Sequence, residues 1–252
     1  MSGGEGNAMT DWGASELTAP AQEPANAAEL DGITADVLAR LAAAGFFGDG
    51  AAAPAFPADR FAALDERVRA TFAVPHTTMT PLARRLLFGL AAAHQPAVSV
   101  VLGTFVGYAA VWLFGPALPP EPLVTARLLA GCDIFDAAID QARANFAALQ
   151  PEHGVRLEVA DAYEFVDRFA EPIDLLYLDV DSAEHGKRDY LGLLRRAQDR
   201  LAPGAPVLAH DVTHPYYLDD VAPYQEAVRD KARFRRTATL HIDPCGLEVT
   251  LV

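Results

Sequence analysis

Apolar residues follow two different spacings along this chain. From about residue 81 onward, short aliphatic runs alternate with longer stretches in which apolar residues recur every three or four positions. Short runs of this kind are typical of buried strands, and the wider spacing is typical of amphipathic helices. We predict strands at 97–102, 126–133, 154–160, 173–179, 206–210, 233–242 and 246–252, and helices at 82–93, 107–115, 136–149, 162–169, 187–201 and 219–230.

The order of these segments predicts an α/β fold built on a Rossmann-like, doubly wound sheet of seven strands. Strands that alternate with helices form parallel sheets that are covered on both faces. Only Asp243-Pro244-Cys245-Gly246 separates the last two strands, and so short a connection joins antiparallel neighbours. We therefore expect a parallel sheet that closes with an antiparallel pair, within a domain of residues 81–252.

The residues before position 81 show another pattern. Residues 1–29 hold few large apolar side chains and so predict a flexible tail. Apolar residues at helical spacing predict helices at 30–46 and 59–72, which are too short to form a domain alone. We expect residues 30–80 to form a helical cap. Three roles stay open for it: a lid over the site, a layer on the back of the sheet, or a dimer contact.

Composition and charge narrow the choice of partners. The formal net charge is −14, which argues against a nucleic-acid partner because binding a phosphate backbone requires a basic face. Cys132 and Cys245 are far apart and form no C-x-x-C pair, so they predict buried thiols in a cytoplasmic protein. No apolar run is long enough to span a bilayer, and no secretory signal is recognisable. We expect a small-molecule partner and no membrane, while a homodimer stays open.

Residues 98–110 carry the strongest local signal. An apolar run, Val-Ser-Val-Val-Leu, leads into Gly103-x-x-x-Gly107 and then into a helix-forming stretch. A buried strand, a glycine turn and a helix together form the nucleotide site of open α/β sheets. Glycine at position 103 lets the backbone turn sharply close to a ligand. Paired glycines also occur in such turns for packing alone, so motifs further along the chain must decide between a binding turn and a packing turn.

Three motifs in this order resemble those of class I S-adenosylmethionine (SAM)-dependent methyltransferases, over roughly residues 75–252. They are Gly103-Thr-Phe-Val-Gly107-Tyr-Ala109, then Gly131-Cys-Asp133 with the helix after it, and then Ile173 to Asp179 with Leu201 to Asp211. The chain is most similar to the catechol and caffeoyl-CoA type O-methyltransferases. The resemblance implies an enzyme with SAM as its cofactor.

By this resemblance, acids at two strand ends would hold the nucleoside of SAM. Asp133 ends its strand where a carboxylate can accept both ribose hydroxyl protons. Asp161 would accept from the adenine amino group, although either acid could instead cap the next helix. Phe105 could lie near the sulfonium, where cation–π attraction is favourable. The implied cofactor contacts are Gly103, Thr104, Phe105, Gly107, Asp133, Asp161, Ala162, Thr78 and Thr80.

Three positions depart from the family pattern. Two residues before the first glycine the family has an acid, but this chain has Val101. The amino-acid end of SAM must then use the turn backbone or the threonines at 77, 78, 80 and 104. Metal-dependent members carry Asp, Asp and Asn at the ends of strands four and five, whereas the third position here is Val212. The general-base lysine expected soon after Asp179 is absent, and Lys187 is interpreted as a solvated helix residue. The apolar Val212 predicts an enzyme without a metal.

Polar and aromatic residues gather at the predicted ends of strands four and five. His210 is a candidate general base oriented by Asp179 or Asp211, unless it only makes a structural hydrogen bond. Asp181 could substitute for the missing metal ligand. The candidate catalytic residues are His210, Asp179, Asp211 and Tyr216.

The leading functional hypothesis is metal-independent O- or N-methylation of a small molecule in secondary metabolism. The alternative is a SAM cyclase or lyase, because the chain is also similar to methyltransferase-fold enzymes that convert SAM to azetidine-2-carboxylate and 5′-methylthioadenosine. In that reaction the amine of SAM itself attacks Cγ, and an apolar Val101 beside the Phe105 ring suits it. A third hypothesis is a non-catalytic partner protein, against which the glycine turn and Asp133 argue.

Overall fold

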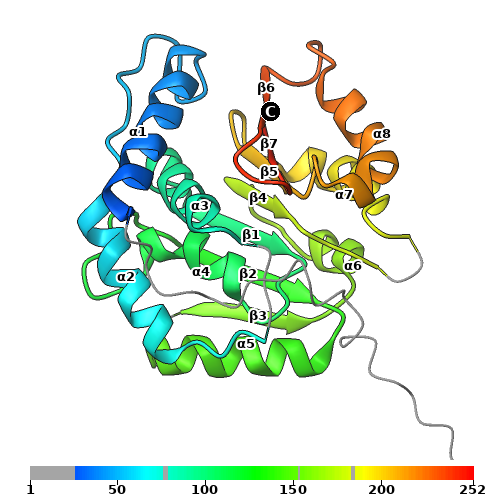
Figure 1. Ribbon diagram of the computed structural model, residues 1–252. Helices are drawn as coiled ribbons and strands as arrows, with labels where there is room; N and C mark the ends of the chain where they lie inside the picture. The colour runs from blue at the N-terminus through cyan, green and yellow to red at the C-terminus, as the bar shows by residue number, and fades with distance from the viewer. Residues whose placement is uncertain (1–25, 76–78, 153, 183–184) are drawn as a thin grey trace, which may run out of the picture.

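The computed structural model describes residues 26–75, 79–152, 154–182 and 185–252. Its centre is one seven-stranded sheet with the strand order β3-β2-β1-β4-β5-β7-β6. Five strands run parallel, and β7 runs antiparallel to both β5 and β6, which confirms the predicted sheet (Figure 1). The strands are β1 (Val98–Leu102), β2 (Leu128–Asp133), β3 (Val155–Val159), β4 (Leu175–Leu178), β5 (Pro206–His210), β6 (Arg236–Leu240) and β7 (Leu247–Leu251).

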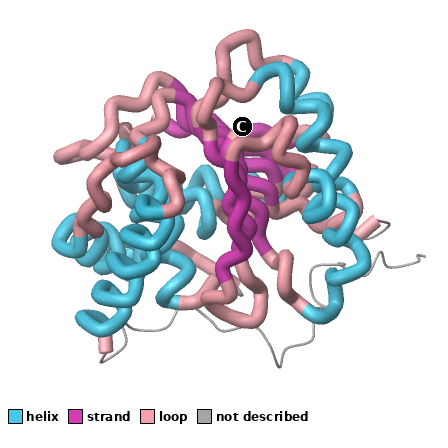
Figure 2. Tube along the Cα trace, turned by 90° about the horizontal axis from the view of Figure 1, so that it is seen from above, coloured by secondary structure: helices cyan, strands magenta, loops and turns pink. Residues whose placement is uncertain are grey.

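Helices cover both faces of the sheet, and Figure 2 shows them on either side of the strands. Val101 in β1 packs with the first group of helices, whereas Val100 and Leu102 pack with the second. Because both faces are covered, β1 is apolar on both sides apart from a serine. The first group is α1 (Ala27–Ala43), α2 (Ala58–Thr71), α3 (Pro81–His94), α4 (Tyr108–Phe114) and α5 (Asp136–Leu149), and the second is α6 (Ala162–Asp167), α7 (Asp189–Ala197) and α8 (Leu218–Val228).

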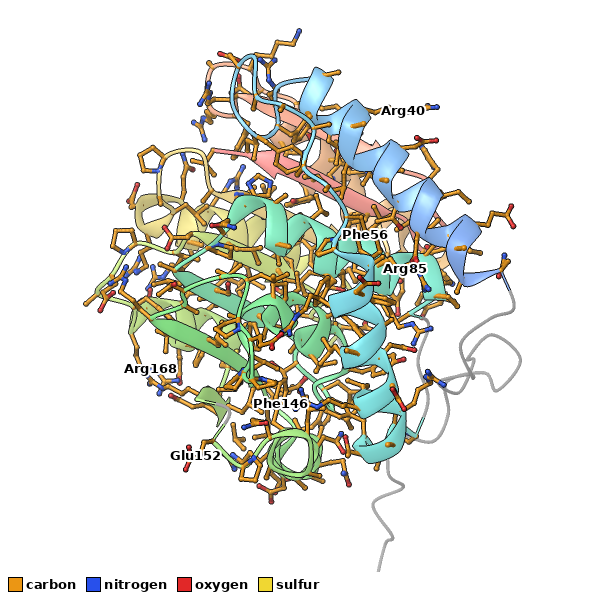
Figure 3. All side chains as sticks on the ribbon, turned by 90° about the vertical axis from the view of Figure 1, so that its left-hand side faces the viewer. Arg40, Phe56, Arg85, Phe146, Glu152 and Arg168 are labelled. Atoms are coloured by element: carbon orange, nitrogen blue, oxygen red, sulfur yellow. The ribbon has the colours of Figure 1, made fainter. Side chains whose placement is uncertain are left out.

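Helices α1 and α2 form an outer layer and belong to the main hydrophobic core. Leu38 in α1 is 0% exposed and Phe61 in α2 is 1% exposed. Arg85 of α3 contacts both helices: its Nε lies 2.6 Å from Oδ1 of Asp31, and its guanidinium carbon lies 4.6 Å from the centre of the Phe61 ring. Figure 3 shows α1 and α2 on the outside with Arg85 between them. Helices α1 and α2 therefore share one core with the sheet.

The ends of some elements differ from the sequence-based prediction. Of the predicted tail, residues 1–25 lie outside the described residues, and residues 27–29 are already helical. Strand β6 is shorter than predicted because the amides of Arg233 and Phe234 bond to the Asp230 carbonyl and extend the turn after α8. Within the described residues, every helix is too short or too polar to cross a lipid bilayer.

The strand order places a ligand crevice between β1 and β4. In doubly wound sheets the crevice lies at the carboxyl ends of the strands where the order reverses. β1 pairs with β2 on one side and with β4 on the other, so the reversal falls between β1 and β4. Leu102 and Leu178 are register partners at the ends of these strands. The next residues along each strand, Gly103 and Asp179, therefore meet at this point.

Candidate active site

The turn after β1 requires glycine at its first position. Gly103 has a φ of 85°, in the left-handed region that favours glycine. A Cβ at this position would lie 2.3 Å from the carbonyl oxygen of Asp179, so the end of β4 packs directly against the turn. The amides of Gly103 and Thr104 donate to the Cys132 carbonyl at 3.1 and 2.9 Å. The turn thus holds the ends of β1, β2 and β4 together.

Three other residues of this turn pack inward. Thr104 is 2% exposed, and its hydroxyl lies 2.4 Å from the place that a Cβ on Gly131 would take. Phe105 is half-buried against the core with a φ of 47°, and a Cβ on Gly107 would lie 3.0 Å from the Phe146 ring. Thr104 can therefore serve a ligand only through its backbone, which corrects the expectation that its side chain holds the amino-acid end.

Asp133 ends β2 beside the glycine turn. Its Oδ2 accepts from the Phe105 amide at 2.8 Å, and its Oδ1 accepts from the Phe135 amide at 3.1 Å. Burial raises the pKa of Asp133, and these amides act in the opposite direction. Each carboxylate oxygen has two lone pairs, so both oxygens can still accept a hydroxyl proton. The position is suited to binding a diol, with the exposed Ile134 beside it.

Asp161 follows β3 and caps α6. Its Oδ1 accepts from the amides of Tyr163 and Glu164 at 2.8 and 3.2 Å. This is the helix-cap role that the sequence left open. The residue is exposed, and Ala162 beside it is half-buried. Its Oδ2 remains free of these cap bonds, so the cap leaves one oxygen for a ligand.

The loop before α3 offers few polar groups to the crevice. Thr78 lies outside the described residues. The Thr80 side chain caps α3, accepting from the Ala83 amide at 3.1 Å, and donates to Oδ2 of Asp243 at 2.9 Å. Its hydroxyl is therefore used to join α3 to the turn between β6 and β7.

A buried lysine lies between two carboxylates at the ends of β4 and β5. Nζ of Lys187 lies 2.8 Å from Oδ1 of Asp179 and 2.8 Å from Oδ2 of Asp211. It also donates to the Tyr190 hydroxyl at 3.0 Å, and the residue is 1% exposed. Burial would lower the pKa of Lys187, but the two carboxylates outweigh burial and raise it well above its usual range. The interpretation of Lys187 as a solvated residue is wrong.

The chain folds back after β4 to place this lysine. Ser182 and Gly186 form an antiparallel bridge with backbone hydrogen bonds of 3.2 and 2.7 Å. Asp220, in the first turn of α8, accepts from the Lys187 amide at 3.4 Å. Lys187 is eight residues beyond Asp179 in the sequence, and this fold-back returns its side chain to that carboxylate.

His210, the last residue of β5, lies beside the same carboxylates and is 3% exposed. Its Nδ1 lies 3.5 Å from Oδ2 of Asp179 and 3.4 Å from Oδ1 of Asp211, and its ring stacks on Tyr177. Burial would lower the pKa of His210, but the two carboxylates raise it to about 9. The raised pKa favours the protonated imidazole, a form that does not suit the general-base role expected for His210.

Asp211 faces a cation with each carboxylate oxygen. Burial would raise its pKa, but His210 and Lys187 outweigh burial and lower it. Its φ of 59° is unusual for a residue with a side chain, and such strain concentrates at functional sites. The next residue, Val212, is 1% exposed and offers no metal ligand. His210, Asp211 and Cys245 hold ligand atoms within 4.8 Å of one another, but a metal there would have to displace the His210 proton.

Tyr217, rather than Tyr216, reaches this cluster. Both lie in a 3₁₀ turn, Pro215–Tyr217, where Tyr216 is 79% exposed and Tyr217 is 4% exposed. The Tyr217 hydroxyl donates to Oδ2 of Asp181 at 2.5 Å, and its ring centre lies 5.1 Å from Nζ of Lys187. The structure does not bring the Tyr216 hydroxyl into the cluster, which corrects its expected catalytic role.

Sequence reasoning missed Tyr190, and it assigned no role in the site to Lys187 or Tyr217. Their one visible signal is that Lys187 and Lys231 are the two lysines of the chain, and that acids stand at 179, 181 and 184 before Lys187. A lysine spaced three residues from a tyrosine at a helix start places both side chains on one face. That spacing fits the bond from Lys187 to Tyr190.

Comparison with known proteins identifies relatives. The model of a family described as a methyltransferase domain matches residues 100–212. Catechol O-methyltransferase of Sus scrofa is 32% identical over 131 residues, which cover 46% of this chain and 67% of that protein. The matched residues include the glycine turn, Asp133, and Lys187 with its two carboxylate partners, Asp179 and Asp211.

Solved structures share the fold. The O-methyltransferase from Bacillus cereus in complex with SAH superposes with a TM-score of 0.59 at 15% identity, covering 77% of this chain and 90% of that one. The O-methyltransferase TomG from Streptomyces achromogenes, in complex with SAM, gives a TM-score of 0.57 at 21% identity, covering 77% and 89%. At these identities the similarity concerns the fold.

Proposed function

This chain belongs to the class I SAM-dependent methyltransferases, and from that premise we propose that it methylates an oxygen or nitrogen of a small molecule, in secondary metabolism, without a divalent metal. The observation that carries the metal-free part is the Lys187 ammonium, 2.8 Å from both Asp179 and Asp211. The SAM contacts rest on the ends of β1, β2 and β3.

The nucleoside of SAM fits the first three strand ends. Gly103 lets the backbone approach the ligand, and Asp133 keeps lone pairs for the ribose hydroxyls. Asp161 keeps one oxygen outside its helix cap for the adenine amino group. Ile134 and Phe135 follow Asp133 with exposed apolar side chains, which suit one face of a purine ring.

Charge and ligand number argue against a divalent ion between β4 and β5. Magnesium requires near-octahedral oxygen ligands. Here Asp179 and Asp211 each bind the Lys187 ammonium, and the side chain of Val212 supplies no oxygen. With His210 protonated as well, two positive charges already face these two carboxylates. A dication there would have to compete with these two cations for the same two carboxylates.

The two buried cations also suit the reaction. Methyl transfer needs an acceptor atom in line with the bond to the departing sulfur, so positioning supplies most of the catalysis. When bound, SAM supplies the activated methyl group. Lys187 and His210 would stabilise an acceptor oxygen that has given its proton to solvent, because fixed positive charges in a buried site favour an oxyanion.

One set of incubations tests the proposal. The protein is treated with EDTA and incubated with SAM alone, with SAM and catechol, and with SAM and a panel of phenols and amines. Mass spectrometry then follows the products. We expect SAH and a methylated acceptor, with the same rate after magnesium is added back. A rate that returns only with magnesium contradicts the metal-free mechanism.

The cyclase or lyase remains the second candidate. The observation that favours it is again Lys187. Its ammonium group is bonded to Asp179 and so occupies the place where a metal ion would bind a chelating acceptor. A reaction within SAM itself needs no such acceptor. Release of 5′-methylthioadenosine and azetidine-2-carboxylate from SAM alone would replace methyl transfer by this activity.

A further inference from the structure

The amino-acid end of SAM carries an ammonium group, and the turn after β1 offers it no carboxylate. Val101 is buried and apolar, and the Thr104 hydroxyl points into the core. The Thr80 hydroxyl is already bonded to Asp243. Hydroxyls used in this way cannot neutralise a charge, so a carboxylate from another strand must do so.

The ends of β4 and β5 carry one more negative charge than positive. Lys187 and His210 supply two cations, which lie within 2.8 to 3.5 Å of Asp179 and Asp211. Asp181 adds a third carboxylate, and its bond within the described residues is to the uncharged Tyr217 hydroxyl. The cluster therefore holds one uncompensated negative charge, which is costly where it is half-buried. A ligand with a single positive charge would neutralise it.

Asp181 lies two residues beyond Asp179, whose backbone contacts the glycine turn and whose carboxylate is already bonded to Lys187. A Cβ on Gly103 would lie 2.3 Å from the Asp179 oxygen and 2.7 Å from the Val180 nitrogen. Asp181 is the next residue, and it is half-buried. Its Oδ2 is fixed by the Tyr217 hydroxyl at 2.5 Å, which leaves Oδ1 for a ligand.

A second group indicates that the cluster receives a polar ligand. Nδ1 of His210 faces the two carboxylates, but Nε2 is buried and has no hydrogen-bond partner among the described residues. Buried nitrogens are rarely left unpaired in folded proteins. His210 is next to Asp211 and contacts Asp179, so this unpaired group belongs to the same cluster as Asp181.

We propose that Asp181 binds the α-ammonium group of SAM, with Tyr217 as the residue that positions its carboxylate. Asp181 thus supplies, from the segment after β4, the carboxylate that the family has in β1 at the position of Val101. The inference rests on the proposed function, because it assumes that SAM occupies the crevice between β1 and β4.

Two ligands that differ only at this end test the inference. SAH carries the ammonium group, whereas 5′-methylthioadenosine has the same nucleoside and thioether without it. Calorimetry measures the affinity of both, and of SAM, for the wild-type chain, for Asp181→Asn and for Tyr217→Phe. Asp219→Asn is the matched control, because it removes the same charge from an exposed acid of α8.

We expect Asp181→Asn to weaken SAH binding by about 30-fold, the lower end of the cost of losing one partner of a buried charge pair, because Asp181 is half-buried. The affinity for 5′-methylthioadenosine should change by less than about twofold. Tyr217→Phe, which keeps the ring, should weaken SAH in the same direction by a smaller factor. Asp219→Asn should leave both affinities unchanged.

Other outcomes overturn the inference in distinguishable ways. An equal loss for both ligands means that Asp181 acts on the fold and not on the ammonium group. Unchanged SAH affinity with weakened SAM affinity assigns Asp181 to the sulfonium instead. A wild-type chain that binds neither ligand overturns the proposed function itself, and this inference with it.

Discussion

The side-chain nitrogen of Lys187 lies 2.8 Å from Oδ2 of Asp211, although the two residues are far apart in the sequence. Lys187 precedes α7 and Asp211 follows β5. A buried ammonium fixed in this way neutralises carboxylates that would otherwise repel each other. The carboxyl edge of the sheet is therefore organised around a cation that belongs to the chain.

Replacing Lys187 by methionine should destabilise the protein strongly. The variant keeps the volume and leaves Asp179 and Asp211 without their shared cation, and breaking a buried ion pair typically costs about 3–5 kcal/mol. Urea denaturation measures the free energy of unfolding. Lys231→Met, at an exposed position, is the control and should stay within about 0.5 kcal/mol of the wild type. Equal stability of the two variants would contradict the role of Lys187.

Stability should fall as the pH rises from about 6.5 to about 9. The pKa of His210 is raised in the folded state to about 9, from 6.5. The folded protein therefore holds this proton more tightly than the unfolded chain does. The resulting stabilisation is complete below pH 6.5 and is lost as the pH passes through 9, by about 3 kcal/mol in all.

The measurement is urea denaturation at pH 6, 7.5 and 9 for the wild type and for His210→Gln. The difference between the two unfolding free energies at each pH removes the contribution of groups that titrate in both proteins. The groups that face His210 are Asp179, Asp211, Lys187 and Tyr177. Parallel curves for the two proteins would mean that His210 is not protonated in this range.

Asp133→Ala should weaken SAH binding by about 1–3 kcal/mol, because it removes the acceptor for the ribose hydroxyls and frees the Phe105 amide. Calorimetry gives the affinity directly. Asp136→Ala, three residues later and exposed at the start of α5, is the control and should bind SAH normally. Normal SAH affinity in Asp133→Ala would remove Asp133 from the cofactor site.

Gly103→Ala should be far more harmful than Gly204→Ala. Both glycines have a left-handed φ, 85° and 81°, so each substitution carries a backbone cost of about 1–2 kcal/mol. A Cβ on Gly204 meets nothing within 4 Å, whereas one on Gly103 would lie 2.3 Å from the Asp179 oxygen. Urea denaturation and SAH affinity should both separate the two variants, and equal effects would show that the close approach is unimportant.

The first turns of α1 should exchange their amide hydrogens more slowly when SAM binds. Asp31 in α1 is paired with Arg85 of α3, and Thr80 caps the same helix from the carboxyl edge. Closing of this segment over the cofactor would exclude water from the reaction. Hydrogen-exchange mass spectrometry compares residues 27–35 with the last turn of α1. Deletion of α1 is a poorer test, because it would expose Leu38 and the rest of its core contacts.

Regular spacing made most of the fold predictable. Helix α5 and strand β5 begin and end at the predicted residues, because each has a clear apolar period bounded by a change in pattern. The acid at the end of β2 was likewise found from its place in the strand order. These features depend on residues that are close together in the sequence, so they can be recognised from one sequence alone.

The arrangement at the ends of β4 and β5 was not predictable in the same way. Lys187 reaches Asp179 only because the irregular segment after β4 folds back through the bridge between Ser182 and Gly186. The exchange of Tyr216 for Tyr217 arises from a 3₁₀ turn, where a shift of one residue reverses which ring is buried. Neither feature produces a repeating pattern of apolar residues, so neither can be recognised from the spacing of such residues in the sequence.

Strand β7 lies between β5 and β6, although it follows both in the chain. Among the described strands, β6 pairs with β7 alone, so the two must enter the sheet together as one hairpin. The turn of that hairpin holds Asp243, which binds the cap of α3. Thr80 and Asp243 are 163 residues apart, and contacts between such distant parts of a chain form slowly. During synthesis, the junction between α3 and this hairpin can therefore form only long after α3 itself has been made.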